Sequence, residues 1–169
     1  MKRAVFALVC LVLLSTGAWA QDDVPNLHQC IASFTNFMKD FSAFSVQNQQ
    51  ALEAEKQAAG YPLTVNYIFY TELEQRTQRL ILLTANVMDF YILYNKTTYC
   101  YGRDEKNFLF SRIDFIQKML QRLLDIPYVV DTSASNADTV RLHDKQAFFE
   151  EQVRKLQAFI TKSLPALKH

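Results

Sequence analysis

The chain has 169 residues, a formal net charge of +1, 50% hydrophobic and 13% aromatic residues. This length is sufficient for one domain with its own hydrophobic core. Nucleic acids and anionic lipids are bound by clustered Lys and Arg, so a near-neutral chain without basic blocks does not favour either partner.

Residues 1–20 have the layout of a secretory signal peptide. Lys2 and Arg3 form a basic start, residues 5–14 are apolar, and Ala18-Trp19-Ala20 provides a small-x-small cleavage site. Cleavage would leave residues 21–169 as a single domain with 16 basic and 17 acidic residues. We therefore expect an exported, soluble protein that is periplasmic or extracellular.

Glycine and proline divide the rest of the chain into four long segments. Gly60, Pro62, Gly102 and Pro127 are the breakers between them. The pattern predicts helices from about residue 26 (with a polar continuation over 47–59), over about 64–96, over about 104–125, and from 135 or 136 onward. Short connections between long helices predict an all-α, antiparallel, up-down-up-down four-helix bundle.

Apolar side chains recur at helical spacing in three of these segments and define the expected core faces. The expected inward positions are Leu27, Ile31, Phe34, Met38, Phe41 and Ser45 in the first helix, Phe108, Leu109, Ile113, Ile116, Leu120, Leu123 and Leu124 in the third, and Phe148, Phe149, Val153, Leu156, Phe159 and Ile160 in the fourth.

Two cysteines remain once Cys10 leaves with the signal peptide. Cys30 lies at the start of the first helix and Cys100 just after the second. Those two helix ends meet at one end of an antiparallel hairpin, and a cysteine pair in an exported protein is most simply a disulfide. The bond would stabilise the fold by about 4 kcal/mol through loop closure.

The second helix contains an apolar run, Leu80–Tyr94, that is too short for a membrane span. A span needs about 20 apolar residues, and this run of 15 contains Asn86 and Asp89. On a helical wheel its apolar arc exceeds about 200°, whereas packing on one side needs little more than about 100°. The helix is therefore either the most buried one or an interface for a partner, and an apolar ligand is a third interpretation.

Two leucines interrupt the polar sector of this helix, and tyrosines cluster near its end. Tyrosine is enriched at interfaces and is also an ordinary cap for an aromatic core. The candidate interface residues are Leu82, Leu93, Tyr91, Tyr94, Tyr99 and Tyr101.

Arg112 falls within the apolar sector of the third helix, where an unpaired buried charge would be costly. Counting helical rises places Asp89 at a similar height on the second helix. We hypothesise a buried Asp89–Arg112 ion pair, the alternative being that Arg112 reaches solvent from the edge of the apolar face.

The residues that carry catalysis or bind cofactors are sparse. His28 and His143 fall off the apolar faces, and the chain has no Glu-x-x-His, Cys-x-x-Cys-His, P-loop or Gly-x-Ser-x-Gly pattern. We expect no enzymatic activity, no cofactor and no metal. The leading expectation is an inhibitor, immunity or chaperone-like protein that binds another protein or a second copy of itself. A carrier of a small apolar ligand in the bundle core is the alternative, and a hydrolase without a recognisable motif comes third.

Overall fold

The computed structural model describes residues 27–58, 64–97, 102–132 and 137–167, and the expected signal peptide lies outside these ranges. The four regular elements of the described ranges are α-helices. They are α2 (Leu27–Ala58), α3 (Val65–Thr97), α4 (Arg103–Asp125) and α5 (Ala137–Leu167). The all-α prediction is confirmed, and the helix bounds fall within one or two residues of those expected.

Local chemistry explains several of these bounds. Thr64 caps α3, because its hydroxyl Oγ1 accepts a hydrogen bond from the backbone N–H of Tyr67 at 3.0 Å. Gly102 and Ile126 have extended backbones on either side of α4. Pro127 then prevents the helix from continuing, since the residue before a proline is disfavoured in helical conformation.

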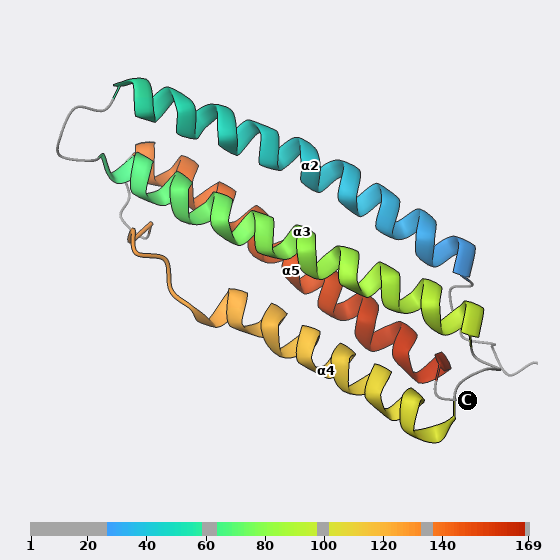
Figure 1. The fold of residues 1–169 in the computed structure, drawn as a ribbon. Helices are drawn as coiled ribbons and strands as arrows, with labels where there is room; N and C mark the ends of the chain where they lie inside the picture. The colour runs from blue at the N-terminus through green and yellow to red at the C-terminus, as the bar shows by residue number, and fades with distance from the viewer. Residues whose placement is uncertain (1–26, 59–63, 98–101, 133–136, 168–169) are drawn as a thin grey trace, which may run out of the picture.

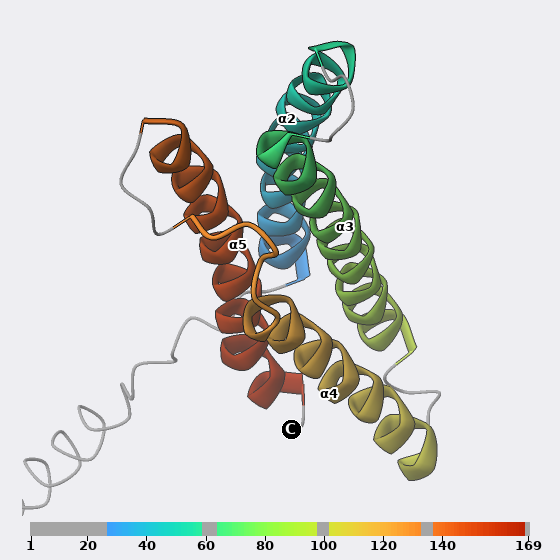
Figure 2. The same ribbon diagram turned by 90° about the vertical axis from the view of Figure 1, so that its left-hand side faces the viewer.

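Successive helices run in opposite directions and pack against one another, as in an up-down bundle (Figure 1). The backbones of α2 and α3 pack together along much of their length, and α3 also contacts α5. α4 has 23 residues whereas α3 has 33, so α4 can cover only part of α3 (Figure 2). None of the four helices, over the residues described, has the length and apolar character needed to cross a membrane.

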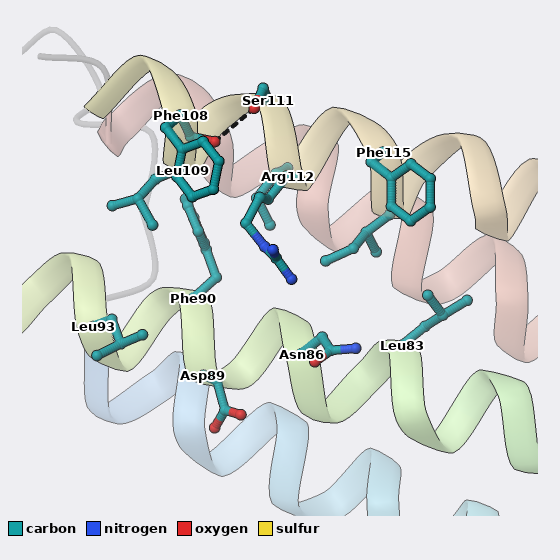
Figure 3. A pocket seen from close by; sticks show the side chains of 12 residues that line it. Leu83, Asn86, Asp89, Phe90, Leu93, Phe108, Leu109, Ser111, Arg112 and Phe115 are labelled. Carbon is teal, nitrogen blue, oxygen red and sulfur yellow. Dashed lines mark hydrogen bonds between the residues drawn. The ribbon is translucent and has the colours of Figure 1, made fainter. Parts of the chain in front are cut away.

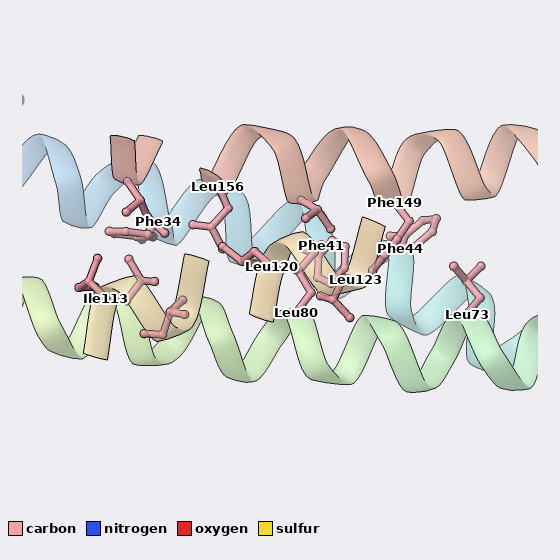
Figure 4. Close-up of a cluster of buried hydrophobic side chains, with 14 of the residues drawn as sticks. Phe34, Phe41, Phe44, Leu73, Leu80, Ile113, Leu120, Leu123, Phe149 and Leu156 are labelled. Carbon is pink, nitrogen blue, oxygen red and sulfur yellow. The ribbon is translucent and has the colours of Figure 1, made fainter. Parts of the chain in front are cut away.

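Aromatic side chains fill the space between α2 and α5. The ring centroids of Phe34 and Phe159 lie 4.7 Å apart, and those of Phe41 and Phe149 lie 6.2 Å apart. Leucines and isoleucines of α3 and α4 complete the same core (Figure 4). Large side chains thus bridge two helices whose backbones are not in close contact.

Two expected core residues face outward instead. Phe108 is 62% exposed, and Phe148 lies at the bundle edge, where its ring centroid is 4.7 Å from that of Phe44 in a tilted pair. The other expected inward residues whose side chains the structure describes are buried or half-buried. Phe108 differs because, among the described helices, α4 contacts α3 and α5, and neither of them covers the side of α4 that carries Phe108.

Candidate functional site: an apolar groove between α3 and α4

The side of α3 that faces solvent is the side that the helical wheel marks as polar. This outward stripe includes the two leucines that interrupt the polar sector. Leu82 is 64% exposed and Leu93 is 48% exposed. The polar members of this stripe are Gln75, Gln78, Arg79, Asn86 and Asp89, and all are exposed. Both leucines are among the residues that the sequence assigned to a candidate interface, together with the wide apolar arc of this helix.

α4 also carries a stripe of side chains that faces outward, and this stripe was not identified from the sequence. Its residues recur at alternating spacings of four and three, the spacing that keeps side chains on one helix face. The stripe comprises Phe108, Arg112, Phe115, Met119 and Arg122, and Ile126, the residue just after the helix, extends it. Phe115 is 61% exposed and Ile126 is 50% exposed. The spacing was visible in the sequence, but α4 has two apolar sectors and only the structure shows which one is covered.

Members of the two stripes line two adjoining hollows between α3 and α4, which share Leu83 and are together called here the α3–α4 groove. One part encloses about 570 Å³ between Leu93 and Phe108 at one end and Leu83 and Phe115 at the other (Figure 3). The next part encloses about 310 Å³, also contacts Leu83, and ends at Ile126. The groove is mostly apolar, and four exposed charged side chains line it: Arg79, Asp89, Arg112 and Arg122.

Asp89 and Arg112 line this groove from facing helices, but the expected buried ion pair is not present. Both side chains are exposed, and no ion pair joins them in the described part of the chain. Figure 3 shows Arg112 extending toward α3 while the Asp89 carboxylate points away from α4. The groove is open to solvent, so neither charge needs a partner to remain hydrated.

Two of the candidate interface tyrosines belong to the core. Tyr91 and Tyr94 are buried, and the Tyr91 hydroxyl is hydrogen-bonded to Ser163 of α5. They occupy the same helical face as the buried Leu80 and Val87. Tyr99, Tyr101 and Cys100 lie outside the described residues, and the side chain of Cys30 is likewise not described.

A buried arginine holds the far end of the groove in place. The Arg76 guanidinium donates hydrogen bonds to three carbonyl oxygens where α4 ends: those of Leu123 at 3.0 Å, Ile126 at 2.8 Å and Pro127 at 2.9 Å. The last carbonyls of a helix lack intrahelical partners and carry partial negative charge, so a cation there is stabilising. We refer to this arrangement as the Arg76 anchor.

Glu72 and Tyr128 complete the Arg76 anchor. Glu72 pairs with Arg76 at 2.6 Å through Oε1 and accepts a hydrogen bond from the Val129 N–H at 2.9 Å through Oε2. The Arg76 guanidinium carbon lies 3.9 Å from the centroid of the Tyr128 ring. Burial raises the pKa of Tyr128, against the opposing effect of the Arg76 charge, so this phenol stays neutral at physiological pH. The backbone just after α4, at Ile126, Pro127 and Val129, is therefore hydrogen-bonded to side chains of α3.

Sequence reasoning did not identify the Arg76 anchor, although a signal was available. Arg76 lies in register with Phe69, Leu73 and Leu80, which are fully buried core residues of α3. An arginine within a buried stripe, four residues after Glu72, predicts a paired charge rather than a surface one.

A second polar cluster lies on the opposite side of the bundle, between α2 and α5. The Lys145 amine donates to the Asn48 side-chain oxygen at 3.1 Å and lies 5.6 Å from the centroid of the Phe44 ring. Burial, assisted by the neighbouring Arg141, lowers the pKa of Lys145. Asp40 and Asp144 line the adjoining hollow and balance the two basic residues. This cluster joins two helices and presents no net charge to a ligand.

No three His, Cys, Asp or Glu side chains gather closely enough to hold a metal ion within the described ranges. His143 is exposed, as its wheel position predicted. Comparison with known proteins adds no family. The chain matches no protein-family model, no curated protein sequence and no solved structure. Any functional conclusion therefore depends on the geometry of the α3–α4 groove.

Proposed function

We propose that the protein is an interaction protein that binds a partner protein in the α3–α4 groove. The observation that carries the proposal is the set of large apolar side chains exposed along both walls: Leu82, Leu93, Phe108, Phe115 and Ile126. Contiguous exposed apolar surface with a polar rim is typical of protein-binding sites, and phenylalanine is enriched in the centres of such sites. An inhibitor, an immunity protein or a chaperone-like binder would use such a groove.

Two structural features support this function over a ligand carrier with its site in the core. A ligand bound in the core would have to lie in the layer between α2 and α5. That layer is filled by aromatic pairs such as Phe34–Phe159 and Phe41–Phe149. The groove, in contrast, opens along its length, and the Arg76 anchor fixes one end of it. A preorganised surface loses less conformational entropy on binding.

Substitution of the groove leucine and phenylalanine tests the proposal. Leu82→Glu combined with Phe115→Glu should weaken partner capture from the native exported fraction by about 100-fold or more, because two carboxylates would be desolvated in an apolar interface. The amount of captured partner is measured by quantitative mass spectrometry at several bait concentrations.

The matched control places the same charges elsewhere on the molecule. Val46 on α2 and Val140 on α5 are 51% and 52% exposed and do not line the groove. Val46→Glu combined with Val140→Glu should capture the partner as wild type does. Wild-type capture by the Leu82/Phe115 variant would rule out the groove as the binding site.

We also propose that the chain is exported and carries a Cys30–Cys100 disulfide. The pattern of residues 1–20 supports export, and the start of α2 lies at the same end of the bundle as the end of α3 (Figure 1). Cys30 is in the first turn of α2, and Cys100 follows Thr97 by three residues. Reduction should raise the intact mass of the purified protein by two hydrogens. An unchanged mass would exclude the bond.

A further inference from the structure

We infer that the partner segment is an acidic amphipathic α-helix of about four turns that lies along the α3–α4 groove. This inference rests on the proposed function and specifies the chemistry of its partner. It follows from the length of the groove, the distribution of polar residues along it and its charge balance.

The length of the groove suits a helix. Along α3 it runs from Arg79 to Leu93, which at about 1.5 Å per residue is about 21 Å, or four helical turns. Its walls are two helices whose side chains recur at spacings of three and four, the geometry into which a third amphipathic helix packs. Asn86, Asp89 and Arg112 interrupt the apolar lining midway. Such interruptions suit a helix with polar flanks better than a continuous acyl chain.

The charge of the groove selects an acidic partner. Three arginines, Arg79, Arg112 and Arg122, line it against a single carboxylate, that of Asp89. None of the three arginine side chains forms an ion pair with any residue that the structure describes. The net positive charge favours a partner with Asp or Glu beside its apolar residues.

The same charge disfavours a second copy of this chain as the occupant. A symmetric dimer brings one patch against itself, so the arginines of one groove would face those of the other. Like charges facing each other across an interface cost binding energy and act against that partner.

Two designed peptides test the inference. Both have about four helical turns with Leu at every third or fourth position, and they differ only in having Glu or Lys on the flanks. Fluorescence anisotropy should show the Glu peptide binding the wild-type protein at least about tenfold more tightly, since each surface charge pair contributes a small factor. Added salt should reduce the difference. Arg79→Glu combined with Arg122→Glu should reverse the preference, and circular dichroism should show the native helix content.

Other results overturn the inference and are distinguishable from failure of the proposed function. Equal binding of the two peptides would mean that the groove accepts apolar helices without selecting acidic ones. If neither peptide shows saturable binding, a dimer in light scattering would assign the groove to a second copy of the chain. Saturable binding of dodecanoate would instead assign the groove to an acyl chain. The proposed protein-binding function has its own test: it fails if the Leu82/Phe115 variant captures the partner as wild type does.

Discussion

Replacing Arg76 with alanine is expected to lower the free energy of unfolding by about 3–5 kcal/mol. The substitution removes the donor for three carbonyl oxygens at the end of α4 and leaves the Glu72 carboxylate, which is only 18% exposed, without its counter-charge. Removal of one partner from a buried ion pair costs more than the net value of the pair, because the remaining charge stays desolvated. Urea unfolding followed by circular dichroism measures the change.

Arg79→Ala is the matched control, because it removes the same side chain one helical turn away. Arg79 is exposed and forms no ion pair within the described residues, so the free energy of unfolding should change by no more than about 0.5 kcal/mol. Similar losses from Arg76→Ala and Arg79→Ala would mean that the Arg76 anchor does not stabilise the fold.

Replacing Phe41 with alanine should also lower the free energy of unfolding by about 3–5 kcal/mol, the range for truncation of a buried phenylalanine. Phe41 is 1% exposed and contacts the rings of Phe37, Phe44 and Phe149. Its removal leaves a cavity between α2 and α5, whose backbones do not approach closely enough to close it easily. Denaturant unfolding at constant temperature gives the value.

Phe115→Ala removes the same atoms from the wall of the groove. Since Phe115 is 61% exposed, its truncation should leave the free energy of unfolding within about 0.5 kcal/mol of wild type. The same variant should weaken partner capture. Equal destabilisation by the Phe41 and Phe115 substitutions would show that Phe115 is a core residue, contrary to its assignment to a binding surface.

The helices and their ends were predictable because they depend on local chemistry. Gly60, Pro62 and Pro127 stop a helix whatever lies nearby, and the apolar periodicity of each segment defines its core face. Leu82 and Leu93 could be placed at the surface for the same reason, since both fall within the polar sector of one helix.

The features that were missed depend on contacts between distant parts of the chain. The spacing of Glu72 and Arg76 signalled a paired charge, but the carbonyl groups that Arg76 binds lie 47 to 51 residues away, and backbone acceptors leave no trace in the sequence of side chains. Phe108 was assigned to the core because it belongs to the apolar surface of α4. That surface is wider than α3 and α5 cover, and Phe108 lies on its uncovered part. Tyr91 and Tyr94 were grouped with the interface by their nearness to one helix end, although their helical register with Leu80 and Val87 places them inside.

Site-specific photo-crosslinking tests most directly whether the α3–α4 groove is the binding surface. Benzoylphenylalanine is placed at Phe115 in one protein and at Val140, exposed on α5, in another, and both are irradiated in the native exported fraction. We expect one dominant adduct from position 115 and none from position 140. Unlabelled wild-type protein should compete with formation of the adduct, whereas the Leu82/Phe115 variant should not. An adduct that forms from position 140 and not from position 115 would contradict the account.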